Sequence, residues 1–215
     1  MPTQVMDTAQ LIALAGALGW ASGIRLYLVV LLTGLAGSLG WFALPSGLQL
    51  LAHPAVLAAS GFMVFVEFFA DKIPGVDSLW DLVHGAIRIP AGAALAAGVF
   101  GADSQAMALV AALLGGTLAA TSFTAKATTR AAINTSPEPF SNIGASLVED
   151  ALVPASLWLA IAHPLIFVPV LLVVLVLSIV LTVVLFKFLK AVARRISAFF
   201  RGRPYRETVE VKRLN

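Results

Sequence analysis

The sequence predicts an all-α fold: a polytopic transmembrane helical bundle of about six spans, with Pro-interrupted helices and two polar inner hairpin loops. The first observation is composition, because the 215 residues are 60% hydrophobic and 12% charged, with a mean hydropathy of +0.95. A soluble domain of this length could not bury so much apolar surface. The second is that long charge-poor runs are interrupted mainly in two segments, residues 67–88 and 126–150. The lipid bilayer is therefore predicted to be the main solvent of one compact domain.

Each predicted span is a run of about 20 mainly apolar residues, the length that crosses a bilayer as a helix. The last run is the cleanest, because residues 164–186 carry no charge and are dense in Leu and Val, and we expect it to face lipid. Small residues at helical spacing predict that the third and fourth runs pack together. These are Ala94 and Gly98 on the third, and Ala112, Gly116 and Ala120 on the fourth. The candidate spans are residues 9–42, 54–71, 79–101, 105–125, 144–163 and 164–187.

The first run is longer than one span and contains Arg25. Two arrangements fit it. In one, residues 11–20 form a short re-entrant or interfacial helix, and the span begins near Arg25, whose side chain reaches the inner surface. In the other, the span begins near Gln10 and Arg25 lies deep, where an unpaired guanidinium costs at least a few kcal/mol and needs a carboxylate partner. The sequence leaves both open.

Charge divides the chain into a transmembrane helical domain, residues 1–186, and a basic end. Nine of the fourteen Lys and Arg residues lie from Lys187 onward, so the formal charge of +3 does not indicate nucleic-acid binding. Within residues 187–201 the basic side chains fall near one helical face, opposite Val, Ile and Phe. This predicts an amphipathic juxtamembrane helix that binds anionic lipid. Residues 202–215 are predicted to form a disordered cytoplasmic tail.

The same charges predict orientation. The loops near residues 43–53, 102–104 and 162–164 contain no Lys or Arg, whereas basic residues flank the loops of the other side. By the positive-inside bias, both termini are expected in the cytoplasm. Residues 1–10 carry no basic residue, so the first run does not resemble a signal peptide and is expected to be retained.

Several classes of chemistry are excluded or disfavoured. The chain has no cysteine, which excludes disulfides, thiolate nucleophiles, Cys-ligated zinc and iron–sulfur clusters. The HExxH, Walker and GxSxG motifs are absent. We therefore expect no cofactor, and an enzyme is a weaker prediction than a non-enzymatic membrane protein.

The first polar segment joins the second and third spans. Pro74 and Gly75 break the chain, and Ser78 followed by Asp81 resembles a capping box that starts the next helix. Pro90 then kinks or breaks that helix. Four ionisable side chains recur at spacings of three or four residues and share one helix face: Asp77, Asp81, His84 and Arg88.

The second polar segment has a comparable layout. Pro137 and Pro139 form the break, and Ser141 or Asn142 is the expected cap of the helix that follows. Pro154 lies further along that helix. The polar stripe on it consists of Asn142, Ser146 and Glu149 or Asp150.

These segments contain the candidate substrate- or ion-binding residues. Ionisable groups at membrane depth are functional hypotheses by default, and carboxylates beside His and basic groups suit proton-coupled transport. Two helix N-termini add positive dipole ends that favour an anion. The main prediction is a small-solute or ion transporter or permease with a charged intramembrane cavity. Its candidate residues are Arg25, Glu67, Asp71, Lys72, Asp77, Asp81, His84, Arg88, Lys126, Arg130, Asn134, Glu149 and Asp150.

Alternatives remain open. The charges nearly balance, so they can also form an internal salt-bridge network that holds one end of the bundle together. Asp77, Asp81 and His84 would suit a membrane-embedded, lipid-headgroup-handling or metal-dependent enzyme, although no metal site is predicted. The small-residue faces would suit a non-catalytic scaffold subunit, and a homodimer is compatible with so small a bundle.

Three stretches resemble a known family: SGIRLYL at residues 22–28, EFFADKIPGVDSLWD at 67–81 and INTSPEPFSN at 133–142. They are similar to the bacterial membrane family catalogued as domain of unknown function 4126, over roughly residues 10–165. The resemblance implies a polytopic inner-membrane protein and supplies no mechanism. The positions that match the family's motifs are Arg25, Asp71, Lys72, Pro74, Asp77, Asp81, Asn134, Pro137 and Pro139.

Overall fold

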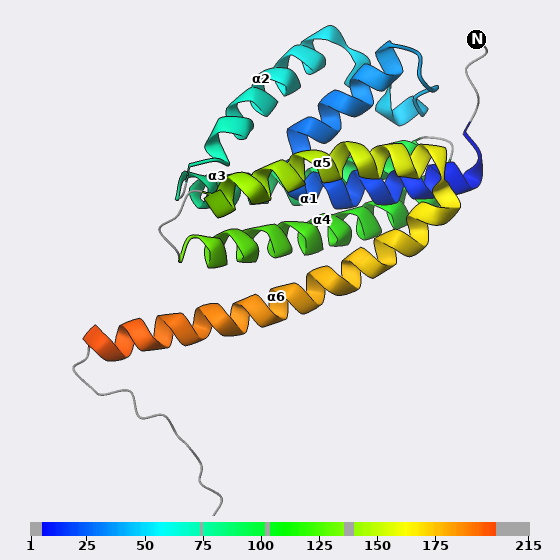
Figure 1. Cartoon of the computed structure of the whole chain (residues 1–215). Helices are drawn as coiled ribbons and strands as arrows, with labels where there is room; N and C mark the ends of the chain where they lie inside the picture. The colour runs from blue at the N-terminus through cyan, green and yellow to red at the C-terminus, as the bar shows by residue number, and fades with distance from the viewer. Residues whose placement is uncertain (1–5, 74, 102–103, 136–139, 201–215) are drawn as a thin grey trace, which may run out of the picture.

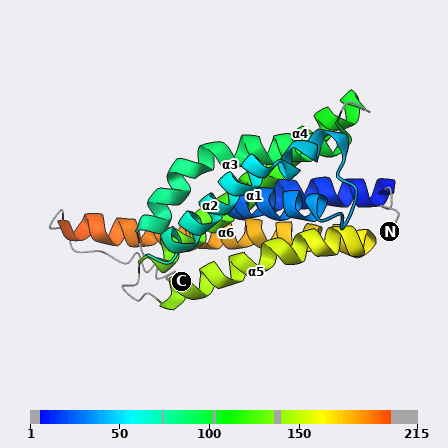
Figure 2. The same ribbon diagram turned by 90° about the horizontal axis from the view of Figure 1, so that it is seen from above.

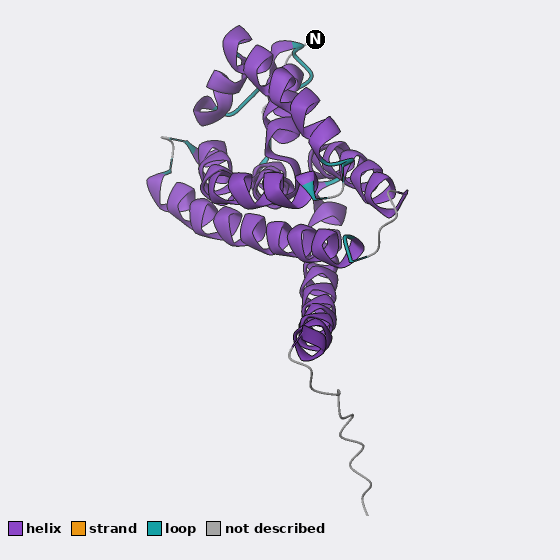
Figure 3. Cartoon of the chain, turned by 90° about the vertical axis from the view of Figure 1, so that its left-hand side faces the viewer, coloured by secondary structure: helices purple, strands orange, loops and turns teal. Residues whose placement is uncertain are grey.

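The computed structural model describes residues 6–73, 75–101, 104–135 and 140–200. This part of the chain forms seven helices and no strand, which confirms the all-α fold (Figures 1 and 3). The predicted disordered tail, residues 202–215, lies outside the described residues. In chain order the helices are α1 (Thr8–Ser38), the 3-10 helix η1 (Ser46–Ala52), α2 (Pro54–Ala70), α3 (Val76–Phe100), α4 (Gln105–Ile133), α5 (Phe140–Ala162) and α6 (Pro164–Phe200).

Length and composition allow five of these helices to cross a membrane: α1, α3, α4, α5 and α6. The pair η1 and α2 is bent by 68° and makes a sixth span if it is counted as one. The expected outer loop at residues 43–53 therefore contains a helix of its own. The chain is a multi-pass helical membrane protein, as the sequence predicts.

The first helix, α1, is broken in the middle. Asp7 starts it, accepting a hydrogen bond from the Gln10 backbone N–H at 2.7 Å, while the Gln10 side chain accepts from the Asp7 N–H at 3.0 Å. Arg25 has φ −144° and ψ 83°, far from helical values. After this break the second half turns back toward the end of the bundle where α1 began (Figures 1 and 2). Accordingly, Leu14 of the first half and Thr33 of the second line the same cavity.

The structure bears on the two arrangements of the first run. The helix begins at Thr8, and the Arg25 side chain is 2% exposed and paired with carboxylates, as the second arrangement requires, while its depth in the membrane stays a prediction. An interfacial position for residues 11–20 does not fit, because Leu14 and Leu18 are completely buried in the core of the bundle.

The fold-back also changes where the chain ends lie. The start of α1 contacts the end of α5, where the Gln10 side chain donates to the Ile161 carbonyl at 3.1 Å. The last turns of α6 lie at the opposite end of the bundle (Figure 1). We call the end with the connections after α2 and α4 the charged end, and the other, with residues 8–14 and 157–165, the apolar end. A single crossing by residues 9–42, on which the expectation of both termini on one side depended, does not fit this path.

Glycines bring α1 against α4. A Cβ placed on Gly19 would lie 2.6 Å from the Cα of Gly115, and one on Gly23 would lie 2.1 Å from the Ala119 carbonyl oxygen. No other residue type could occupy these positions without a backbone shift. The two backbones therefore touch, and the broken helix is fixed in the centre of the bundle.

Glycines and alanines also join α3 to α4, which confirms that the third and fourth runs pack together. A Cβ on Gly92 would lie 2.7 Å from the Ala119 Cβ, and one on Gly115 would lie 2.4 Å from the Ala96 Cβ. Ala94, one of the residues expected at this contact, is exposed instead. Small residues recur on several faces of these helices, so spacing alone did not identify the face that packs.

The boundaries of α3 differ from the prediction. The helix begins directly after Gly75, whose φ of +86° is readily adopted only by glycine, and Ser78 does not cap it. Asp77 instead accepts a hydrogen bond from the Gly75 N–H at 2.8 Å. Pro90 lies inside a continuous helix, which bends (Figure 2).

One further boundary differs. Because α5 begins at Phe140, Ser141 and Asn142 lie inside its first turn and do not precede it. Pro154 lies within α5, as it does in the predicted span 144–163. The basic segment predicted from residue 187 continues α6 without interruption and extends away from the bundle (Figures 1 and 3).

Candidate functional site

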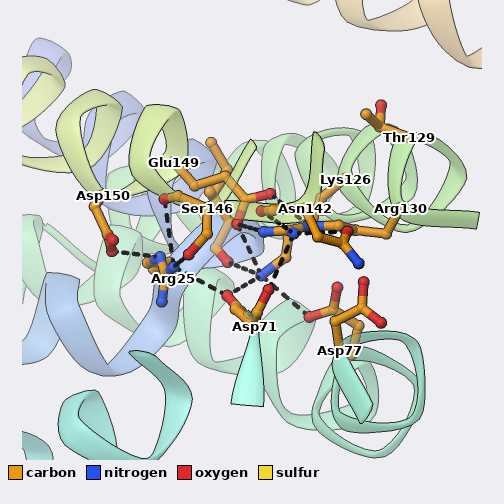
Figure 4. A network of polar contacts seen from close by, with 12 residues as sticks. Arg25, Asp71, Asp77, Lys126, Thr129, Arg130, Asn142, Ser146, Glu149 and Asp150 are labelled. Carbon is orange, nitrogen blue, oxygen red and sulfur yellow. Dashed lines mark hydrogen bonds and ion pairs between the residues drawn. The ribbon is translucent and has the colours of Figure 1, made fainter. Parts of the chain in front are cut away.

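Charged side chains from five helical segments meet inside the charged end of the bundle (Figure 4). They come from the break of α1, the end of α2, the first half of α3, the second half of α4 and the first half of α5. Nine ion pairs of 4.0 Å or less connect them in the described part of the chain. We call this set the charged cluster. Its ion-paired members are Arg25, Glu67, Asp71, Lys72, Asp81, Arg88, Lys126, Arg130, Glu149 and Asp150.

Arg25 occupies the break of α1 and links three elements. Its Nη2 lies 3.1 Å from Asp71 Oδ2, and its Nε lies 2.9 Å from Asp150 Oδ1. Nη2 also donates to the Ser146 hydroxyl at 2.8 Å. These bonds provide the carboxylate partners that a buried guanidinium requires.

Lys126 is the most shared cation of the cluster. Its Nζ lies 3.1 Å from Asp71 Oδ2, 3.1 Å from Asp81 Oδ1 and 3.2 Å from Glu149 Oε2. It also donates to the Ile24 carbonyl at 3.2 Å, directly before the break of α1. A single ammonium thus holds carboxylates from the ends of α2, α3 and α5 against α1.

Arg88 forms the deepest part of the cluster. It pairs with Glu67 and, at 2.6 Å, with Asp81 Oδ1, and all three side chains are at most 2% exposed. One oxygen of each carboxylate, Glu67 Oε2 and Asp81 Oδ2, is buried without a hydrogen-bond partner among the described residues.

Arg130 connects the ion pairs to a chain of amides. It forms a two-bond fork with Glu149, at 3.1 and 3.0 Å, and its Nη1 donates to the Asn142 carbonyl at 2.9 Å. The Asn142 amide donates to Asn134 Oδ1 at 2.8 Å, and the Asn134 amide donates to Asp77 Oδ1 at 2.9 Å. Asp77 and Asn134 therefore belong to the cluster through hydrogen bonds.

The cluster reaches the surface at Lys72 and Asp150, whose side chains are 20% and 27% exposed and whose Nζ and Oδ2 lie 3.9 Å apart. The Lys72 Nζ donates to the Phe68 carbonyl at 3.1 Å and lies over the Phe68 ring. Burial lowers the pKa of Lys72 below its usual value by more than Asp150 raises it. This pair is the most exposed part of the ion-paired cluster, and we call it the Lys72 entrance.

His84 is the one candidate that does not join these contacts. Its ring stacks on Trp80 with centroids 3.9 Å apart, meets the Tyr27 ring edge-on at 5.9 Å, and places Nδ1 2.9 Å from the Trp80 carbonyl. In the residues that the structure describes, no group of three or more His, Asp or Glu side chains is arranged to hold a metal ion.

The remaining twelve candidate residues converge, which the spacing along each segment did not reveal. Five cations face six carboxylates in the described part of the cluster, counting Asp77. Ser146 and Asn142 were recognised as a polar stripe but not as site residues, although both bond buried arginines. Tyr27 and Trp80 were missed, because aromatic residues in apolar runs carry no distinctive signal.

The fold and the cluster define a class: a polytopic α-helical membrane protein with a largely buried charge network at one end of its bundle. The chain matches the family described as Domain of unknown function (DUF4126) over residues 12–184, and it belongs to that family. Neither a curated protein nor a solved structure matches it. The family assignment confirms the resemblance carried by the three sequence stretches.

Proposed function

We propose that the protein is a proton-coupled transporter or permease for a small solute or ion, and that the charged cluster is its coupling site. The observation that carries the proposal is the sharing of one ammonium, that of Lys126, by three carboxylates from three helices. A proton on any one of them removes one attraction and leaves the others in place. The ion pairs can therefore be exchanged one at a time, as a transport cycle requires.

The excess of acid over base supports the same proposal. With six carboxylates against five cations, one negative charge is left without a full partner. An isolated charge in a medium of low dielectric is expensive, so one proton is expected to be shared among the carboxylates. Four of the six carboxylates keep a buried oxygen without a hydrogen-bond partner among the described residues: Glu67, Asp71, Asp81 and Asp150.

The helix that would move is α5. It carries both Glu149 and Asp150. Two cavities, of about 380 and 140 Å³, lie against its residues 152–162 and leave space beside the helix. Pro154 removes one backbone hydrogen bond from its middle. Displacement of α5 would separate Asp150 from Arg25 and Glu149 from Arg130, which opens the cluster at the Lys72 entrance.

We further propose that the protein lies in the inner membrane with its charged end on the cytoplasmic side. Lys72 and the basic part of α6 lie at this end, whereas η1 and the turn between α5 and α6 contain no Lys or Arg. The C-terminus is then cytoplasmic. Because α1 doubles back, the N-terminus lies on the opposite side, which replaces the expectation of two cytoplasmic termini.

Proton flux into liposomes tests the proposal. The protein is reconstituted with a pH-sensitive dye inside, and a pH gradient is imposed with valinomycin and K⁺ present. Wild type is expected to dissipate the gradient faster than protein-free liposomes, and Asp81→Asn is expected to fall to the protein-free rate. The control is Lys187→Gln, which removes an exposed charge of α6 outside the cluster and should leave the rate unchanged.

A salt-bridged scaffold is the second candidate, favoured by the nine internal ion pairs of the described residues. It predicts no flux from wild type and a loss of folded protein in Asp81→Asn. The transporter predicts that Asp81→Asn inserts and keeps its helix content while flux disappears. Circular dichroism and flux on the same samples separate the two.

A further inference from the structure

A cavity of about 380 Å³ lies at the apolar end, far from the charged cluster along α1 and α5. Its walls are the two halves of the broken helix α1 and the last turns of α5, with Leu14, Ala36, Leu157 and Trp158 among them. The volume falls in the range of about 300–1,000 Å³ found for small-molecule pockets. The fold-back at Arg25 creates this space, because it holds the two halves of α1 apart at their outer ends.

One residue at the cavity wall carries a buried polar group without a hydrogen-bond partner. The Thr33 side chain is 3% exposed, and its hydroxyl oxygen is buried and makes no hydrogen bond to any described residue. A threonine in a helix commonly donates to the carbonyl four residues earlier, as Thr117 and Thr121 do in α4. Thr33 does not, and a buried unsatisfied hydroxyl is unfavourable. Rotation about the Cα–Cβ bond would turn the hydroxyl toward the cavity, where a hydrogen-bond acceptor on a bound molecule would satisfy it.

We propose that this cavity binds one hydrocarbon chain of a membrane glycerophospholipid, with the ester carbonyl of that chain accepting a hydrogen bond from Thr33. The other lining groups are aliphatic or aromatic, so a water-soluble ligand would leave its polar atoms unpaired there. A flexible alkyl chain fits both the volume and the apolar walls.

Aromatic residues at the mouth indicate how the lipid enters. Trp41 and Trp158 line the cavity and are 74% and 62% exposed. Trp158 also meets His163 edge-on at 5.5 Å, at the turn between α5 and α6. Tryptophan is enriched where hydrocarbon meets lipid headgroups, which is the depth at which an ester group lies. The cavity therefore opens to lipid at the level where Thr33 meets an ester. This inference depends on membrane insertion and not on the proposed transport.

Native mass spectrometry of the purified full chain tests it, with dioleoylphosphatidylcholine added during purification as the probe. Wild type is expected to retain one phospholipid at detergent conditions that strip the rest. Ala36→Phe fills the cavity and should lose that phospholipid. The matched control Ala94→Phe adds the same side chain to an exposed position of α3 and should retain it.

Thr33→Val provides a second, milder variant, because it removes the hydroxyl and keeps the branched shape. It should lower retention, with an apparent dissociation constant raised about tenfold if the lost bond contributes about 1.4 kcal/mol. Equal retention by wild type, Ala36→Phe and Thr33→Val would mean annular lipid only and would overturn the proposal. Retention of a second copy of the chain through this face in place of lipid would overturn it as well.

A tryptophan fluorescence measurement gives an independent readout. In liposomes whose phosphatidylcholine carries brominated acyl chains, Trp158 and Trp41 are expected to be quenched by the bound chain. The extent of quenching should fall in Ala36→Phe and stay unchanged in Ala94→Phe. Identical quenching in the two variants would contradict a chain inside the cavity.

Discussion

Buried arginines in this bundle are held by buried carboxylates, and Arg88, which pairs with Glu67 of α2 and Asp81 of its own helix α3, is the clearest case. It lies with Glu67 and Asp81 at the deepest point of the cluster, and all three are at most 2% exposed. Because both charges lose their hydration, such a buried pair contributes little to stability. Removal of one partner is nevertheless strongly destabilising, because it leaves an unpaired buried charge. The arginine is therefore required mainly because the carboxylates are present.

Arg88→Leu is expected to destabilise the protein by about 3–5 kcal/mol, because Glu67 loses its only ion-pair partner among the described residues. Asp81 keeps Lys126 at 3.1 Å. The double variant Arg88→Leu with Glu67→Leu should therefore recover most of the loss. Reversible unfolding in mixed micelles, followed by circular dichroism, measures both. A double variant as unstable as the single one would contradict this account of Arg88.

Lys72 allows the electrostatics of the entrance to be measured. Its pKa lies below the usual value because burial disfavours the charged ammonium, so its neutral amine is populated at lower pH than that of an exposed lysine. Amine acylation followed by mass spectrometry should therefore reach half-extent at lower pH for Lys72 than for a lysine in an unstructured peptide. Asp150→Asn should lower the midpoint for Lys72 further, because Asp150 favours the charged form. A midpoint equal to that of the peptide would show that the Lys72 side chain is fully hydrated.

At the scale of the helix, the sequence predicts where spans lie better than how they bend. Long apolar runs locate α3 to α6, because length and hydropathy are local properties. The break at Arg25 is decided by partners that are distant in sequence, Asp71 and Asp150, so the first run remained ambiguous. Pro90 was expected to kink or break its helix, and α3 continues past it with a bend, as a helix surrounded by protein or lipid can.

The contact of α1 with α4 makes a sharp prediction. Gly23→Ala would place its Cβ 2.1 Å from a backbone carbonyl of α4, which no side-chain movement relieves. We expect a loss of stability of about 1–3 kcal/mol or more, measured by thermal unfolding in detergent. Gly144→Ala is the matched control on α5, where nothing lies within 4 Å of the added Cβ. It should be neutral or stabilising by about 0.5–1 kcal/mol, from helix propensity alone. Equal effects would contradict the close approach of α1 and α4.

For the whole molecule, the composition of the site was predictable and its connectivity was not. A chain with few charges that places them in two segments indicates where polar chemistry must lie, and twelve of the thirteen candidates do meet. Which cation meets which carboxylate depends on helix rotation and depth, which a single sequence does not encode locally. His84 shows the limit, because it shares the face of Asp81 yet stacks on Trp80.

The fold-back of α1 predicts that the two ends of the chain lie on opposite sides of the membrane. The chain contains no cysteine, so single reporters can be placed without background. Thr8→Cys, at the exposed start of α1, should react in intact cells with a membrane-impermeant maleimide. Ser197→Cys, exposed near the end of α6, should react only after the membrane is permeabilised.

The alternatives give distinct patterns with the same two variants. If residues 9–42 crossed the membrane once, both cysteines would be protected until permeabilisation, because an even number of spans returns the chain to its starting side. With α1 doubled back, an odd number of crossings remains and only one cysteine is protected. Labelling of Ser197→Cys alone in intact cells would keep the fold-back but reverse the proposed orientation. It would also place the Lys72 entrance on the outside, so that protons would reach the charged cluster from that side.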